Sequence, residues 1–218
     1  KSTAAFDINI GCSGFVYGLS VAFLYAQQPH IRKVLLLDGE TRSRIYSPKD
    51  RKTAFLFGDG GAAAIIEKTN APRQSLFAMG SDGSRSDLIK MDAGGYRNPS
   101  SPDTLKEKVI DDHGNIRSEE HGYMNGADVF SFVLREIPKN VKTIFNHSSL
   151  DADSIDAFYF HQANKYMNDY LTKKLKVPAG KTPQSLQKFG NTSSVSIPLT
   201  IVDHEGGNCV HSKTWFLS

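Results

Sequence analysis

Cys12 is the side chain of this 218-residue sequence with the clearest capacity for nucleophilic chemistry. It lies in the string Gly11-Cys12-Ser13-Gly14, between residues 3–10, which predict a strand, and residues 15–27, which predict a buried helix, apolar on nearly every face. Unpaired N–H groups and the helix dipole at a helix N-terminus stabilise a thiolate, and the glycines allow a sharp turn that leaves the sulfur accessible. The alternative is a buried structural thiol, and the local sequence does not decide between the two.

His161 and Asn191 are two further candidates, because each follows a predicted element that could present it at a site. His161 ends an apolar strand predicted over residues 154–160 and precedes a predicted helix, so its side chain can project at the sheet edge. Asn191 opens a loop of small residues. The alternatives are a structural histidine and an asparagine that caps a turn. The other six histidines lie in polar surroundings typical of a surface, and Cys209 lacks the setting of Cys12.

The elements that must position these residues alternate between strand and helix, which favours an α/β fold with covered sheets. Residues 33–38 are a continuous aliphatic run, typical of a strand covered on both faces. A strand over 54–57, a glycine turn and another strand are expected next. Residues 80–121 are polar and predict a long surface excursion. The remaining predictions are helices over 126–145 (bent or interrupted at Pro138), over 164–176 and from 196, and a short strand over 212–218.

The composition is that of a globular protein, with 39% hydrophobic residues, 22% charged residues and a net charge of +3. The basic residues are scattered, which excludes a nucleic-acid-binding tail, and no apolar run approaches the roughly 18 residues of a membrane helix. Two cysteines are too few for a disulfide framework or a Cys-based zinc site, so we expect a cytoplasmic setting without nucleic-acid or membrane partners. Because the first residue is Lys1, we also expect the chain to come from a larger protein.

Five motifs run through most of the chain in a fixed order: residues 5–15, Phe57-Gly58-Asp59-Gly60, residues 124–130, His161-Gln162-Ala163-Asn164 and Gly190-Asn191-Thr192-Ser193. Cys12 and His161 are 149 residues apart, and His161 and Asn191 are 30 apart (161−12=149; 191−161=30). In this order and with these separations, the sequence resembles β-ketoacyl-acyl-carrier-protein synthase III, a family of the thiolase-like superfamily. The resemblance implies a thiolase-like αβαβα layered fold, an α/β architecture built from two similar halves and incomplete at both ends here.

The resemblance also implies a catalytic triad of Cys12, His161 and Asn191. In such enzymes the thiolate takes an acyl group from acyl-CoA, and the enolate formed when malonyl-acyl-carrier protein loses carbon dioxide attacks the resulting thioester. A thiolate is a good nucleophile and leaving group, while an imidazole and an amide can donate hydrogen bonds to the developing enolate. His161 is therefore expected to act mainly as an oxyanion donor.

Five more positions are expected to bind substrate on the same resemblance. Arg51 matches an arginine near the CoA nucleotide, with a solvated loop charge as the alternative. Phe57 and Phe130 are expected to line the acyl channel, with a place in the core as the alternative. Gly126 belongs to a matched motif, and Asn164 is expected to brace the loop of His161.

Two departures from the family pattern are visible. Tyr166, beside Lys165, stands where the family usually has an arginine that serves CoA or carrier-protein phosphates, which leaves the acyl donor open between acyl-CoA and an acyl carrier protein. The family's first half-domain and its final glycine-rich loop are also missing. We therefore expect residues 1–122 to be the remainder of the N-terminal half with the polar excursion, and residues 123–218 to be a truncated C-terminal half.

The leading hypothesis is an acyltransferase that initiates fatty-acid synthesis, with acyl-CoA and acyl carrier protein as partners and no metal or resident cofactor. A homodimer is expected, in which residues 3–10 pair with their mate across the dimer axis. The alternatives are a specialised acyltransferase or condensing enzyme of a lipid or polyketide pathway, and an inactive fragment with a structural role.

Overall fold

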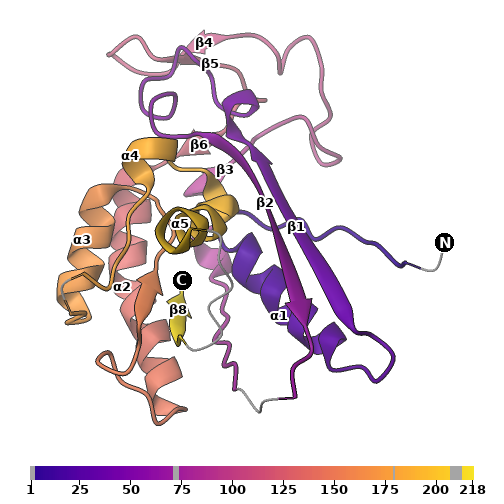
Figure 1. Ribbon diagram of the computed structural model, residues 1–218. Helices are drawn as coiled ribbons and strands as arrows, with labels where there is room; N and C mark the ends of the chain where they lie inside the picture. The colour runs from indigo at the N-terminus through magenta and orange to yellow at the C-terminus, as the bar shows by residue number, and fades with distance from the viewer. Residues whose placement is uncertain (1–2, 71–73, 179, 207–212) are drawn as a thin grey trace.

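The computed structural model describes residues 3–70, 74–178, 180–206 and 213–218 (Figure 1). Its helices are α1 (Gly14–Ala26), α2 (Gly126–Asn146), α3 (Lys165–Lys174), α4 (Leu186–Phe189) and α5 (Ser196–Glu205), with short 3-10 helices η1 (Arg42–Arg44), η2 (Gly83–Arg85) and η3 (Ser193–Val195). Its strands are β1 (Lys33–Thr41), β2 (Asp59–Glu67), β3 (Ile89–Lys90), β4 (Lys108–Val109), β5 (Ile116–Arg117), β6 (Tyr123–Met124), β7 (Ala157–Tyr159) and β8 (Trp215–Leu217).

The longest sheet pairs β1 with β2 in antiparallel register, from Lys33 opposite Glu67 to Thr41 opposite Asp59. Burial alternates along both strands because successive side chains point to opposite faces. The prediction that residues 33–38 are covered on both faces is wrong for this chain, since Leu35 and Leu37 are 59% and 70% exposed. Only the inner face, which carries Leu36, packs against helices.

The strand predicted over residues 54–57 is also wrong. The backbone there is held by turn hydrogen bonds, from Ala54 N–H to the Asp50 carbonyl and from Leu56 N–H to the Thr53 carbonyl. These local bonds take up the groups that a sheet ladder needs. Phe57 makes only an isolated parallel bridge, and the strand that follows begins at Asp59.

Residues 3–10 are extended and exposed but pair with no strand in the described part of the chain, and they run away from the body of the molecule (Figure 1). The prediction of a strand is thus wrong for the single chain, because a strand needs a hydrogen-bonded neighbour. Phe6, Ile8 and Ile10 are all exposed in this segment.

Helix α1 begins and ends within one residue of its predicted bounds. Its buried side includes Phe15 and Ala22, and Gly18 lies so close to β1 that a Cβ there would come 2.9 Å from Leu36 Cδ1. Leu24 and Tyr25, at 62% and 45% exposure, show that the predicted burial on nearly every face is wrong. The helix is covered on one side in this chain.

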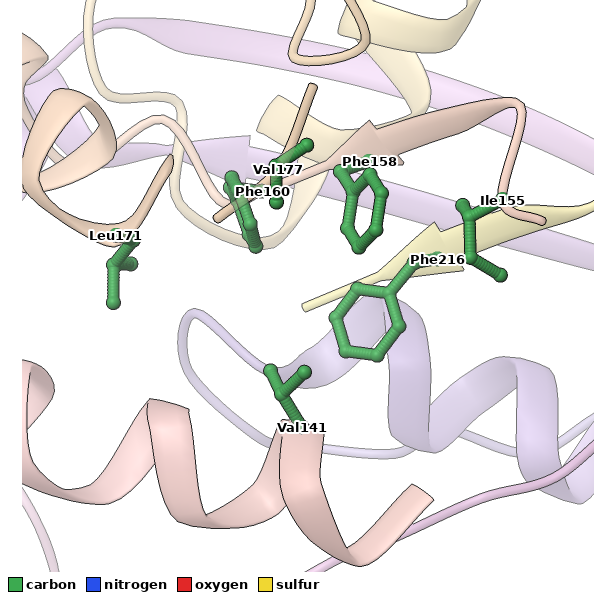
Figure 2. Close-up of a cluster of buried hydrophobic side chains, with 7 residues drawn as sticks. All are labelled: Val141, Ile155, Phe158, Phe160, Leu171, Val177 and Phe216. Carbon is green, nitrogen blue, oxygen red and sulfur yellow. The ribbon is translucent and has the colours of Figure 1, made fainter. Parts of the chain in front are cut away.

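A second core forms where α2 and α3 pack against the parallel pair β7–β8 (Figure 2). Helix α2 continues through Pro138 to Asn146, so the prediction of an interruption is wrong, and burial of Pro138 and Val141 against the core holds that turn in place. The strand predicted over 154–160 is shorter, because β8 offers only three residues for pairing. The predicted final strand is confirmed by β8. The core side chains are Val141, Ile155, Phe158, Phe160, Leu171, Val177 and Phe216.

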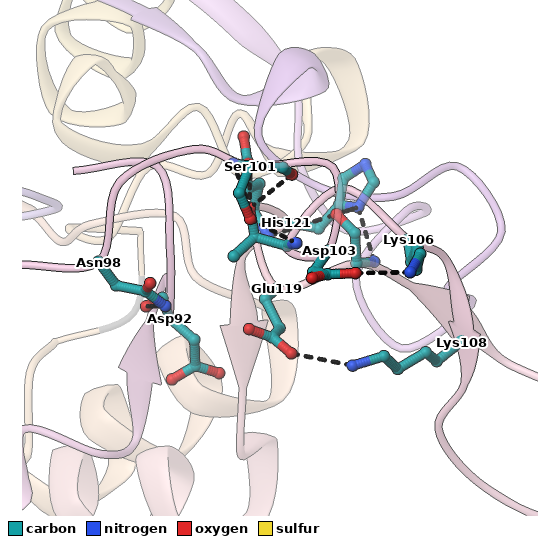
Figure 3. A network of polar contacts seen from close by, with 11 residues as sticks. Asp92, Asn98, Ser101, Asp103, Lys106, Lys108, Glu119 and His121 are labelled. Carbon is teal, nitrogen blue, oxygen red and sulfur yellow. Dashed lines mark hydrogen bonds and ion pairs between the residues drawn. The ribbon is translucent and has the colours of Figure 1, made fainter.

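The polar excursion over residues 80–121 is confirmed as a surface segment with little regular structure. Its short pairs, β4 with β5 and β3 with β6, are joined by loops tied by polar contacts such as Lys108 to Glu119 at 2.9 Å (Figure 3). Such exposed ion pairs each contribute little stability, which fits a connection lying outside both cores. Within the described ranges, we find no helix with the length and apolar character needed to cross a membrane.

Candidate active site

Cys12 lies in the turn that leads into α1, as predicted. The Gly14 N–H donates to the Gly11 carbonyl at 2.7 Å, which closes the turn directly before the helix. The sulfur is partly buried, and the Ser193 hydroxyl donates a hydrogen bond to it at 3.6 Å. His161 also interacts electrostatically with the sulfur. The thiol thus meets residues from the opposite end of the chain.

The surroundings of Cys12 favour its thiolate. Burial by itself raises the pKa of the thiol, but the interactions with His161 and Ser193 and the charge of Arg42 outweigh burial and lower the pKa from its ordinary value to about 7. Because the thiolate is the nucleophilic form, much of Cys12 is ready to react near neutral pH.

His161 lies two residues after the end of β7, and its Nδ1 lies 2.7 Å from the Ser196 hydroxyl. That hydroxyl already accepts a bond from the Gln162 N–H at 3.1 Å, so its own hydrogen is free to point at Nδ1. If that hydrogen is donated to Nδ1, the neutral imidazole carries its proton on Nε2. In this form the ring can donate from Nε2 without releasing a proton.

Replacing Ser196 with alanine should slow condensation by about tenfold, because one hydrogen bond that fixes the imidazole tautomer is lost. Acylation of Cys12 should change less, since Ser196 does not contact the sulfur. The measurement is a comparison of single-turnover acylation with malonyl decarboxylation in full-length protein. Ser131→Ala is the matched control, because Ser131 is exposed and its hydroxyl donates to the Ala127 carbonyl within α2. Unchanged decarboxylation in Ser196→Ala would refute the assignment.

The backbone of Asn191 is held by two hydrogen bonds, one through its N–H and one through its carbonyl. Its N–H donates to the Leu56 carbonyl at 2.9 Å, and its carbonyl accepts from the Gly58 N–H at 3.0 Å. Gly190, with φ of 68°, supplies a turn that other residues disfavour. The side-chain oxygen accepts from the Ser193 N–H at 2.9 Å, which leaves the amide NH2 as the group that can donate to a ligand.

The structure also brings charged residues of β1 and η1 to this loop, which the sequence analysis missed. Arg42 Nη2 donates to Ser193 Oγ at 2.6 Å and to Glu40 Oε1 at 3.0 Å. The Ser194 hydroxyl lies 2.8 Å from Asp38 Oδ1 and 2.9 Å from the same Glu40 oxygen. The available signal was the alternation of β1, which places Asp38 and Glu40 on the same inner face as Leu36.

Phe57 and Arg51 lie in two different hollows. The Phe57 ring stacks on Tyr46, with centroids 4.2 Å apart, and both line a hollow of about 260 Å³ together with Arg42. Arg51 lines a separate, more open hollow of about 390 Å³ with three polar residues, Lys52, His113 and Asn115. Phe57 thus shares a hollow with Arg42, which contacts Ser193, whereas Arg51 lies in the other hollow.

The other predicted binding residues lie on α2 and α3. Gly126 is the exposed first residue of α2, and Phe130 packs against Tyr166 with ring centroids 5.5 Å apart. Asn164 caps α3, where its side-chain oxygen accepts from the Met167 N–H at 2.8 Å. None of these contacts includes Cys12, so their roles in substrate binding stay predictions. Cys209 lies outside the described residues.

Comparison with known proteins identifies the family. Residues 6–83 match the family model of 3-oxoacyl-[acyl-carrier-protein (ACP)] synthase III, and residues 145–212 match that of its C-terminal part. The chain belongs to the 3-oxoacyl-ACP synthase III family. The first matched region contains Cys12, and the second contains His161 and Asn191.

Relatives and a solved structure agree with this assignment. A β-ketoacyl-ACP synthase III of Fusobacterium nucleatum is 33% identical over 202 residues, and one of Aliarcobacter butzleri is 36% identical over 203 residues; each alignment covers 92% of this chain and 58% of the relative. A crystal structure of a 3-oxoacyl-ACP synthase III, 36% identical, superposes with a TM-score of 0.90 over 97% of this chain and 63% of that one. The chain therefore has the expected thiolase-like α/β fold. It spans about three fifths of the length of these relatives.

Proposed function

We propose that the full protein is a β-ketoacyl-ACP synthase III, which condenses an acyl thioester with malonyl-ACP through an acyl-cysteine intermediate. The observation that supports it best is the meeting of three distant segments at one sulfur. His161 interacts with Cys12 and lowers the pKa of its thiol. Ser193 donates its hydroxyl to the Cys12 sulfur and its N–H to the side-chain oxygen of Asn191. One nucleophile and two hydrogen-bonding side chains are thereby gathered at one place.

In the first step, the Cys12 thiolate attacks the carbonyl carbon of the acyl thioester. A bond forms between that carbon and Sγ, the original carbon–sulfur bond breaks, and the thiol carrier leaves after taking up a proton. A thiol with a pKa near 7 suits this exchange, because it is ionised near neutral pH and also leaves readily in the later step.

In the second step, malonyl-ACP loses carbon dioxide as the bond to its carboxylate breaks. The electron pair moves into an enolate, whose oxygen would accept hydrogen bonds from Nε2 of His161 and the amide NH2 of Asn191. The enolate carbon then attacks the acyl group on Cys12, and the thiolate leaves. No net proton transfer from His161 is required, which fits an imidazole whose Nδ1 accepts from the Ser196 hydroxyl and whose proton is on Nε2.

The test is acylation of the full-length protein with labelled acyl-CoA and, separately, labelled acyl-ACP, with peptide mass spectrometry to locate the label. We expect stoichiometric label on Cys12, none in Cys12→Ala, and normal label in Cys209→Ser. Wild-type protein that takes no label from either donor would contradict the proposal and favour an inactive, structural chain. Label that persists in Cys12→Ala would place the nucleophile elsewhere.

Tyr166 supports a second candidate, a specialised acyltransferase or condensing enzyme of a lipid or polyketide pathway. Its ring is 70% exposed and packs on Phe130, where a phosphate-binding arginine is usual in the family. A neutral phenol attracts phosphate less than a guanidinium does. Normal acylation of Cys12 without decarboxylation of malonyl-ACP would favour this candidate.

We further propose a cytoplasmic homodimer that uses acyl-CoA and acyl carrier protein, without a resident cofactor, at the start of fatty-acid synthesis. The exposed, extended segment 3–10 supports the dimer, because its apolar side chains and free backbone groups suit pairing with a second copy. The division at residues 122 and 123 is likewise a proposal.

A further inference from the structure

We propose that Arg42 is a positioning residue, which orients the Ser193 hydroxyl toward the Cys12 sulfur and so helps to hold that sulfur as a thiolate. The inference deepens the proposed function and rests on it for its importance in acylation. The reactivity of the thiol can nevertheless be measured without any substrate.

The direction of the relay follows from which groups can donate. A guanidinium only donates hydrogen bonds, so Ser193 Oγ must accept at 2.6 Å from Arg42 Nη2. The hydroxyl hydrogen is then left to donate, and the Cys12 sulfur lies 3.6 Å from Oγ. A hydroxyl that accepts a bond from a cation is polarised into a better donor, which favours a negatively charged sulfur.

Arg42 is fixed in this position. Its Nη2 also donates to Glu40 Oε1 at 3.0 Å, and the two side chains are only 17% and 13% exposed. Within the described ranges, the buried Nε of Arg42 has no hydrogen-bond partner. A largely buried ion pair with an unpaired donor is a costly way to gain stability, which points to a role beyond packing.

The backbone of Ser193 gives a second, independent observation. Ser193 is fully buried and has φ of 56°, a conformation that is unfavourable for a residue with a Cβ. This strained geometry places the hydroxyl between Arg42 and Cys12 and the N–H against the Asn191 side chain. One residue thus links the guanidinium, the thiol and the amide.

The charge of Arg42 also acts on Cys12 through space, so the relay must be separated from a direct charge effect. The experiment measures the rate of iodoacetamide alkylation of Cys12 against pH in full-length protein, by peptide mass spectrometry. The variants are Arg42→Gln, Ser193→Ala and the two combined. Arg44→Gln is the matched control, because Arg44 belongs to the same short helix η1 but is exposed.

We expect each single variant to slow alkylation at about pH 6 by about tenfold, because less thiolate is present. The combined variant should be no slower than the slower single variant, since both changes break the same relay. Arg44→Gln should stay within about twofold of the wild type. In all variants alkylation at high pH should recover.

Two results would overturn the proposal. In the first, Arg42→Gln slows alkylation as much in the Ser193→Ala background as in the wild type, so that Arg42 acts on the thiol by its charge alone. In the second, Ser193→Ala leaves the pH profile of alkylation unchanged. If Arg42→Gln does not fold, it is replaced in the double-mutant cycle by the variant that combines Glu40→Gln with Arg42→Gln, which removes both charges of the ion pair. Because alkylation needs no acyl donor, a protein that fails to accept acyl groups but shows the expected cycle would refute the proposed function and not the relay.

Discussion

His161→Ala should reduce condensation by about a thousandfold while Cys12 still becomes acylated. The loss comes from removing a donor to the enolate oxygen, which develops its charge only in the second step. Acylation should also slow near pH 7, because the interactions with His161 that lower the pKa of Cys12 disappear. Its pKa rises, less thiolate is present at neutral pH, and the acylation rate should recover as the pH is raised.

The measurement pairs single-turnover acylation across pH with malonyl-ACP decarboxylation on pre-acylated protein. His147→Ala is the matched control, because His147 is exposed at the end of α2, where its ring Nδ1 lies 2.8 Å from the Thr143 carbonyl oxygen. It should leave both steps unchanged. Decarboxylation at the wild-type rate in His161→Ala would exclude the proposed oxyanion role.

Gly58→Ala should destabilise the fold by about 3 kcal/mol and abolish most condensation. A Cβ at residue 58 would lie 2.1 Å from the Phe189 carbonyl oxygen, which is backbone and cannot rotate away. The Gly58 N–H holds the Asn191 carbonyl at 3.0 Å, so any shift that relieves the clash also moves the catalytic loop. The effect on activity should therefore exceed that expected from unfolding alone.

Urea unfolding and decarboxylation assays on the same preparations test this expectation. Gly61→Ala serves as the control, because residue 61 is exposed on β2 and its Cβ would lie 3.9 Å from the Asp38 carbonyl oxygen, an ordinary van der Waals contact. The Gly61→Ala variant should unfold at a urea concentration close to that of the wild type and keep its activity. Equal stability of Gly58→Ala and the wild type would show that the loop tolerates the added methyl group.

Two of the candidate side chains, Cys12 and His161, could be found from sequence because each sits beside a strongly patterned element. The helix that follows Cys12 and the apolar strand before His161 fix those two residues locally. Asn191 gained its meaning only from the surrounding motif, since an isolated asparagine in a loop usually caps a turn. Family membership and fold were confirmed, whereas the roles of the site residues stay predictions.

The relay residues could not be found in the same way. Arg42 and Ser193 are 151 residues apart in sequence, and no local pattern reports a contact over that distance. The run 54–57 was misassigned for a related reason, because turn hydrogen bonds to Asp50 and Thr53 outweigh its β propensity. Similarly, the continuous aliphatic run in β1 could not show that the outer face of the β1–β2 sheet, with Leu35 and Leu37, is exposed in this chain.

The bridge between Phe57 and Asn191 ties the shape of a hollow to the position of the Asn191 side chain. The ring of Phe57 lines the hollow beside Tyr46, while the peptide groups on either side of it hold the backbone of Asn191. Under the proposed function, with the acyl chain in this hollow, cutting back residue 57 to admit a bulkier chain would also loosen the loop of Asn191. Substrate range and turnover would then be mechanically coupled at this point, so that neither could be redesigned without changing the other.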